Sequence, residues 1–130
     1  IPASAYVTAQ RVRRLLCDEF DRALKEVDVL LAPTEGLPAP TIEECEKGFA
    51  EVNGERIMLQ DARGTRGTLC TIPFNLSGHP AISVCCGFSS NGLPIGMQIV
   101  GPAFREDMIF RIAHAYERMA EWYLKTPALL

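Results

Sequence analysis

Two short apolar runs, PAISVCC at residues 80–86 and PIGMQIV at residues 94–100, decide the fold of this chain. Each has the length and bounding residues of a β-strand. The segment SSNG at residues 89–92 lies between them and has the polar and glycine residues that favour a tight turn. The sequence therefore predicts an antiparallel hairpin.

Two amphipathic helices are predicted outside this hairpin. Over residues 4–27 apolar side chains recur every three or four positions, and Ser4 is suited to cap the first turn. A second helix is predicted to begin near Asp107, because apolar residues recur at the same spacing. Its apolar stripe consists of Ile109, Ile112, Tyr116, Met119 and Tyr123.

A third strand is predicted over residues 27–32, where the run VDVLLA ends at Pro33. A near-continuous apolar run of this length is typical of a strand buried on both faces. We expect this strand to lie parallel to the strand at residues 80–86, which makes the chain an α/β protein. The expected architecture is part of a mixed β-sheet flanked by amphipathic helices.

The connection between these strands is predicted to be mostly irregular. Residues 33–56 contain many prolines, glycines and carboxylates, which favour turns and surface loop with one helical turn near residues 43–47. A further helix is expected over residues 56–70. Three strands are few for an open sheet, and the sequence begins with Ile1 and Pro2 instead of methionine. We therefore expect residues 1–130 to be a single incomplete domain that self-associates as a homo-oligomer through its open sheet edges.

Composition limits the possible partners and the location. The net charge of −3 provides no basic field for a phosphate backbone, so direct binding to nucleic acid is not expected. The longest apolar stretch, at residues 80–86, is far shorter than the roughly 20 residues of a membrane-spanning helix, so no membrane association is expected. Five cysteines, an odd number without regular spacing, indicate a reducing compartment and hence the cytoplasm.

Few residues suggest chemistry by themselves. Cys85 or Cys86 with His79 is a conceivable thiol and imidazole pair for acyl transfer, although buried cysteines in a strand are more often small core residues. His114 and Glu117 stand three positions apart on a helix, but no further metal-ligating residue converges with them in sequence. No phosphate-binding glycine loop precedes a helix. We therefore expect neither a metal nor another cofactor.

Longer motifs resemble a known family. The stretch TIPFNLSGHPAISV at residues 71–84, followed by CGF at residues 86–88 and GLPIGMQIVGP at residues 92–102, is similar to the C-terminal part of the amidase signature enzymes. The segments DVLLAPT at residues 28–34 and AHAYE at residues 113–117 also fit the family. The joint occurrence of these segments in this order covers nearly the whole chain.

This resemblance implies a function for the complete enzyme. The family hydrolyses amides with a serine nucleophile, a second serine on a cis peptide bond and a lysine, and all three lie upstream of the segments matched here. The isolated 130-residue chain is therefore expected to be inactive as an enzyme. Its expected role is scaffold and one wall of the pocket for a small amide substrate.

Four residues are candidates for that wall: Thr68, Thr71, Phe74 and Asn75. In the tRNA-dependent amidotransferases, the subunit that belongs to this family typically has an aspartate at the position of Thr68, where it holds glutamine. A threonine hydroxyl cannot bind an ammonium group as a carboxylate does, which favours a stand-alone amidase. The alternative is a non-catalytic truncated paralogue that acts as a binding or self-association module.

Overall fold

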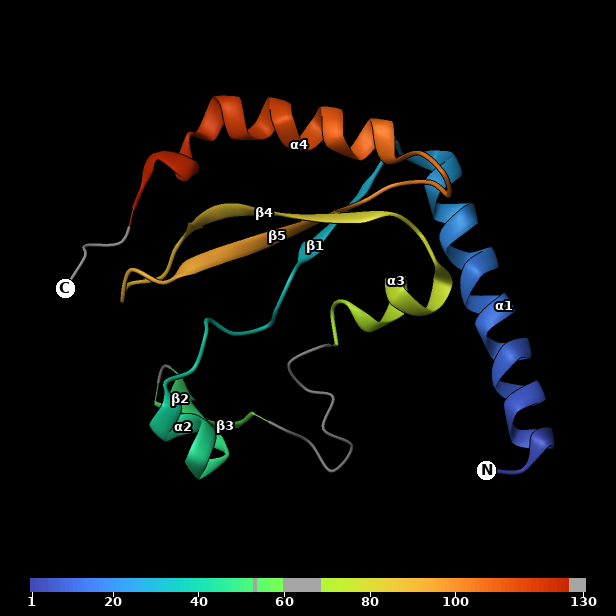
Figure 1. The fold of residues 1–130 in the computed structure, drawn as a ribbon, viewed down its shortest axis with the longest axis horizontal. Helices are drawn as coiled ribbons and strands as arrows, with labels where there is room; N and C mark the ends of the chain where they lie inside the picture. Colours follow the sequence, from blue (N-terminus) through green and yellow to red (C-terminus); the bar gives the residue numbers. More distant parts are fainter. Residues whose placement is uncertain (53, 60–68, 127–130) are drawn as a thin grey trace.

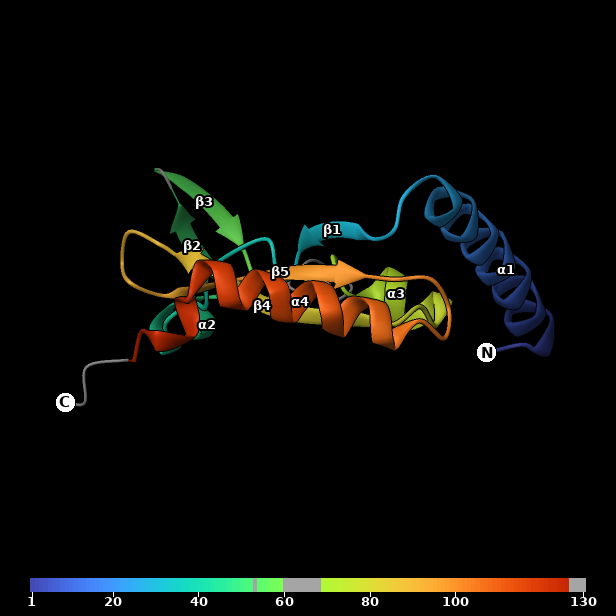
Figure 2. The ribbon, with the colours of Figure 1, turned by 90° about the horizontal axis from the view of Figure 1, so that it is seen from above.

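The computed structural model describes residues 1–52, 54–59 and 69–126. Strands β1, β5 and β4 form a three-stranded sheet. Figure 1 shows helix α4 along one face of this sheet and helix α3 on the other side, while helix α1 lies at one end. Figure 2, seen from above, shows α4 running along β4 and β5. The α/β character expected from the sequence is confirmed.

The central hairpin is formed by strands β4 (Ala81–Phe88) and β5 (Pro94–Val100). They pair antiparallel, from Ala81 opposite Val100 to Phe88 opposite Pro94, with an irregularity between Cys85 and Gly87. This confirms the hairpin predicted from the two apolar runs. In the turn, Gly92 adopts a φ of 78°, which glycine enters without steric cost.

Strand β1 (Leu30–Pro33) pairs with the other edge of β5, so the sheet order is β1-β5-β4. Because β1 and β4 are both antiparallel to β5, they run in the same direction, as expected, but they are not neighbours. Every strand pair in the described residues is antiparallel. The prediction that the first strand is buried on both faces is wrong: α4 packs against β4 and β5, β1 lies at the end of the described sheet, and Leu31 remains 61% exposed.

The apolar core lies between α4 (Glu106–Ala120) and the sheet. Ile109 of the predicted stripe packs against Val84 and Ile99, and Ile112 and Tyr116 are partly buried against this core. Ala113, which is not in the predicted stripe, is also buried there. Gly101 permits this close packing, since a Cβ there would lie 2.7 Å from Ile109 Cγ2. The end of the predicted stripe does not join the core: Met119 is exposed, and α4 ends before the short 3-10 helix η2 (Trp122–Leu124).

Helix α1 (Ala3–Glu26) confirms the first predicted helix, but its predicted N-cap is wrong. Pro2 occupies the cap position, and Ser4 lies inside the first turn. The carbonyl of Pro2 accepts the first hydrogen bond, from the amide of Ala5 at 3.0 Å. Among the helices of residues 1–52, 54–59 and 69–126, none combines the length and the hydropathy of a membrane-spanning segment.

The described part of the connection between β1 and α3 contains more regular secondary structure than expected. Helix α2 (Ile42–Lys47) confirms the predicted helical turn, and Thr41 and Glu44 form a capping box at its start. Strands β2 (Phe49–Val52) and β3 (Glu55–Met58) then form a hairpin in place of the predicted loop.

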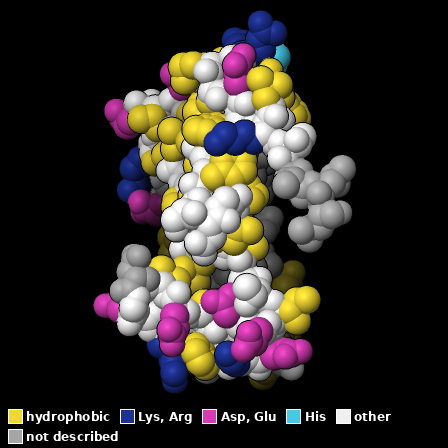
Figure 3. Space-filling view, turned by 90° about the vertical axis from the view of Figure 1, so that its left-hand side faces the viewer, with side chains coloured by type: hydrophobic (Ala, Val, Ile, Leu, Met, Phe, Trp, Pro, Cys, Tyr) yellow, Lys and Arg dark blue, Asp and Glu magenta, His cyan; other side chains and the backbone are white. Residues whose placement is uncertain are grey.

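The prediction of a helix over residues 56–70 is therefore wrong at residues 56–58, which belong to β3. Residues 60–68 of the predicted helix lie outside the described residues. Cross-strand pairing and the guanidinium of Arg56, 4.0 Å from the centre of the Phe49 ring, stabilise the hairpin in place of a helix. Figure 3 shows the side of the molecule that is on the left in Figure 1. Acidic side chains gather over its lower part, where α2, β2 and β3 lie.

Candidate functional site

A cavity of about 280 Å³ lies between α3 (Ile72–Ser77) and the sheet face opposite α4. Three of the four residues predicted to form a pocket wall, Thr71, Phe74 and Asn75, line it together. The fourth, Thr68, lies outside the described residues. The remaining lining residues are Thr34, His79, Ala81, Ile82, Ser83 and Gln98.

A pair of hydroxyl groups forms part of this wall. Thr34 Oγ1 and Ser83 Oγ lie 2.6 Å apart, although Thr34 follows β1 and Ser83 belongs to β4. Gly96 of β5 lies beneath them: a Cβ at this position would be 2.8 Å from Thr34 Oγ1 and 2.9 Å from Ser83 Oγ. The pair therefore depends on glycine at position 96, since any larger residue would occupy the same space.

Gln98 contributes a polar group from the middle strand. It is opposite both Ala32 and Ser83 in the register, and only 5% of its surface is exposed. Its Nε2 donates a hydrogen bond of 3.0 Å to the carbonyl of Cys70, just before α3. The side chain is therefore fixed, and it holds the segment that carries Thr71 against the sheet.

Helix α1 holds α3 in place from the other side. Arg13 Nε donates to the carbonyl of Leu76 at 2.6 Å, and the rings of Phe20 and Phe74 lie 4.9 Å apart. Gly78, in the left-handed conformation, ends α3, as is common after a helix. These contacts fix the orientation of the helix that carries Phe74 and Asn75.

His79 acts as a structural link between α1 and the start of β4. It is 7% exposed, its Nδ1 lies 2.9 Å from Ser77 Oγ, and its Nε2 lies 3.2 Å from Asp21 Oδ1. The Cys85 thiol instead donates to the carbonyl of Gly87. Both ring nitrogens of His79 face Ser77 and Asp21. The geometry therefore does not support a catalytic pair of His79 with Cys85 or with Cys86.

The other candidates do not form a site. His114 is exposed on α4, and in the described part of the chain no three His, Cys, Asp or Glu residues are grouped to hold a metal.

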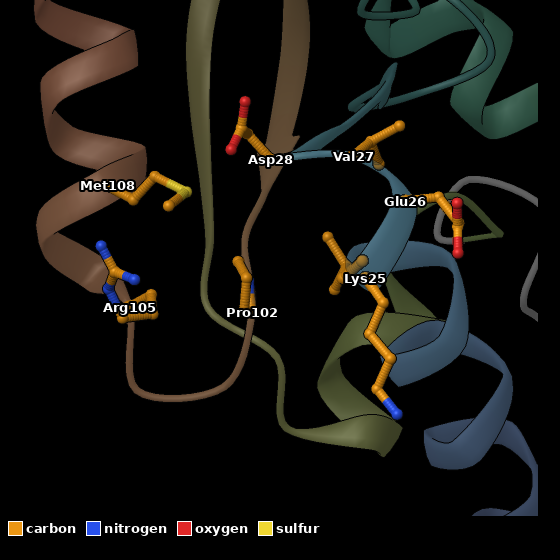
Figure 4. Close-up of a pocket in the computed structure, with 8 residues that line it drawn as sticks. Lys25, Glu26, Val27, Asp28, Pro102, Arg105 and Met108 are labelled. Atoms are coloured by element: carbon orange, nitrogen blue, oxygen red, sulfur yellow. The ribbon is translucent and has the colours of Figure 1, made fainter.

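A second cavity, of about 310 Å³, lies between the end of α1 and the start of α4 (Figure 4). Its Arg105 is bound to Asp107 at 2.9 Å, and this hydrogen bond lowers the pKa of the Asp107 carboxyl. In Figure 4 Lys25 extends away from Arg105, so the charged groups do not converge.

Comparison with known proteins identifies the family to which this chain belongs. The Amidase family model matches residues 2–110, so the chain belongs to the amidase family. Two similar relatives are glutamyl-tRNA(Gln) amidotransferase subunits, 42% identical over 123 residues in Microcystis aeruginosa and 44% identical over 122 residues in Brevibacillus brevis. These matches cover 95% and 94% of the chain, which spans only 23% and 22% of the two relatives.

Solved structures of the family share the fold. A 6-aminohexanoate cyclic dimer hydrolase complexed with substrate superimposes with a TM-score of 0.79 at 31% identity, over 98% of this chain and 27% of that one. The corresponding amidotransferase subunit from Thermotoga maritima gives a TM-score of 0.71 at 34% identity, over 92% of this chain and 24% of that one. The resemblance inferred from the sequence motifs is thus confirmed.

Six lining residues were not among the predicted wall residues. Three of the six are polar residues to which sequence analysis gave no role: Thr34, Ser83 and Gln98. The sequence pattern places Thr34 at the start of a loop and the other two on strands, without a role. The alternation of side chains along β4 and β5 indicates which residues share a face. This alternation does not indicate that α3 covers that face. The sequence alone could therefore not assign Thr34, Ser83 and Gln98 to a cavity.

Proposed function

We propose that the complete protein hydrolyses the C–N bond of a small linear amide and that this chain forms one wall of the substrate pocket. Its Ser-cisSer-Lys triad would lie in polypeptide preceding Ile1, as the family resemblance implies. The observation that carries the proposal is the cavity in which Thr71, Phe74 and Asn75 meet, together with membership of the amidase family. We propose these residues, with Thr68, as substrate contacts.

Both stand-alone amidases and amidotransferase subunits have this fold, so the fold does not distinguish them. The two relatives compared above are amidotransferase subunits. Thr68 favours a stand-alone amidase, because a hydroxyl group cannot replace a carboxylate in binding the ammonium group of glutamine. The odd number of cysteines supports action in the cytoplasm.

A chimera tests this function directly. The matching quarter of 6-aminohexanoate cyclic dimer hydrolase, which this chain overlays with a TM-score of 0.79, would be replaced by residues 1–130. We expect the chimera to hydrolyse amides and the isolated chain to be inactive. A folded but inactive chimera would contradict the pocket-wall role. Hydrolysis by the isolated chain that survives Cys85→Ala, Cys86→Ala and His79→Ala would contradict an upstream triad.

A second proposal, supported by the open sheet, is a binding module that self-associates. Strand β4 has eight residues and pairs with β5 alone among the described strands, so its other edge is open to further pairing. Such an edge can pair with a second copy of the chain. This would suit a non-catalytic paralogue, and it makes a homo-oligomer the expected state of the isolated chain.

A further inference from the structure

The described residues that line the α3 cavity are a mixture of neutral polar and apolar residues, together with His79. Among its described lining residues none is Asp, Glu, Lys or Arg, while Thr34, Thr71, Asn75, Ser83 and Gln98 supply neutral polar groups. The imidazole of His79 is directed to Ser77 and Asp21. A charged ligand group placed here would lose hydration without gaining an opposite charge, which is unfavourable.

The Thr34 and Ser83 hydroxyl pair provides a directed hydrogen-bond donor. Each hydroxyl has one O–H donor and two lone pairs. At 2.6 Å one O–H is used within the pair, so the O–H of the accepting hydroxyl stays available. No other side-chain hydrogen bond joins either hydroxyl to the described residues. Either hydroxyl can be the accepting one; Ser83 is exposed, Thr34 is half-buried, and both line the cavity, so the free O–H is within reach of a ligand there in either case.

We propose that the Thr34 and Ser83 pair, held over Gly96, is a specificity-determining element that hydrogen-bonds the carbonyl oxygen of an uncharged amide. This inference rests on the proposed function and narrows it to a substrate class. The neutral lining disfavours substrates that place a carboxylate or an ammonium group in this cavity. Thr34 and Ser83 then orient the substrate and do not take part in bond cleavage.

The test uses three probes of nearly equal shape and different charge: benzamide, benzoate and benzamidinium. Their binding to the 130-residue chain is measured by NMR, from the shifts of the backbone amides of Thr34, Ser83 and Gly96. We expect benzamide to bind about tenfold more tightly than either charged probe. Ser83→Ala and Thr34→Val should each weaken benzamide binding about threefold to tenfold. Thr34→Ser should retain binding, because it keeps the hydroxyl.

Ser90→Ala is the matched control, because Ser90 is exposed in the turn between β4 and β5 and does not line the cavity. The dispersion of the NMR spectrum verifies that each variant is folded. Equal affinity for the three probes, or unchanged affinity in Ser83→Ala and Thr34→Val, would overturn the inference while leaving the pocket role intact. Absence of any shift at the three amides would also overturn it. Failure of the proposed function is recognised separately, by an inactive folded chimera.

Discussion

The hydroxyl oxygens of Thr34 and Ser83 lie 2.6 Å apart, although strand β5 lies between the strands that carry or precede these residues. Adjacent strands are about 4.8 Å apart, so the backbones of the two outer strands are separated by roughly 10 Å. The side chains bridge this gap directly above Gly96 of the central strand. The contact therefore joins β1, β5 and β4 at one point of the candidate pocket wall.

Replacing Gly96 with alanine is expected to separate this pair. The new Cβ would lie within 3.0 Å of both hydroxyl oxygens, so the side chains of Thr34 and Ser83 must move away from it. We expect a loss of about 1–3 kcal/mol in the free energy of unfolding, measured by urea denaturation. Gly36→Ala is the control, since a Cβ there meets nothing within 4 Å and should change stability by less than about 1 kcal/mol. Equal effects of the two variants would refute the steric role of Gly96.

Ile109→Ala tests the core beneath α4. Ile109 is 2% exposed and packs against the sheet, so its truncation should leave a cavity and cost about 2–5 kcal/mol of unfolding free energy. Met119→Ala on the same helix removes a side chain that is 78% exposed and should cost less than about 0.5 kcal/mol. Thermal and urea unfolding compare the two variants. Similar losses would show that α4 does not cover the core as described.

His79→Ala should loosen the attachment of α1. The substitution removes the imidazole contacts with Ser77 and Asp21, and we expect a loss of about 2 kcal/mol in stability. Hydrogen exchange should accelerate in α1 more than in the β4–β5 hairpin. His114→Ala, at an exposed position of α4, is the matched control and should have little effect. Normal protection of α1 in His79→Ala would contradict the linking role of His79.

Acid should weaken the start of α2. The backbone amide of Thr41 donates to the Glu44 carboxylate, which lowers the pKa of Glu44 from its ordinary value of 4.5. A carboxyl with a lowered folded-state pKa contributes stability above pH 4.5 and loses it as the pH falls through that lowered value. The protection of the Cys45 and Gly48 amides, taken relative to their intrinsic exchange rates at each pH, should therefore decrease below pH 4.5. Glu44→Gln should remove this pH dependence; if it persists there, another group is responsible.

The open edge of β4 predicts self-association of the isolated chain. Light scattering over a wide range of concentrations should show a mass that rises above that of the 14.3 kDa monomer. Backbone amides of β4 should become more protected from hydrogen exchange as the concentration increases. A monomer at every concentration would argue against the homo-oligomer.

Local sequence pattern determined much of this protein by itself. The turn and its flanking apolar runs predicted the β4–β5 hairpin, and the helical spacing predicted α1 and α4, because these elements form between residues close in the chain. The family motifs selected Thr71, Phe74 and Asn75, which the fold brings to one cavity.

Only the tertiary structure decided which strand is central and what surrounds the cavity. Placing β5 between β1 and β4 joins Thr34 to Ser83, 49 positions apart, and no local periodicity encodes such a contact. Leu31 is exposed because α4 packs against β4 and β5 and does not extend over β1, although the sequence of β1 resembles a buried strand. Strand order and packing depend on the free energy of the whole assembly of elements, whereas helices and tight turns depend mainly on near neighbours.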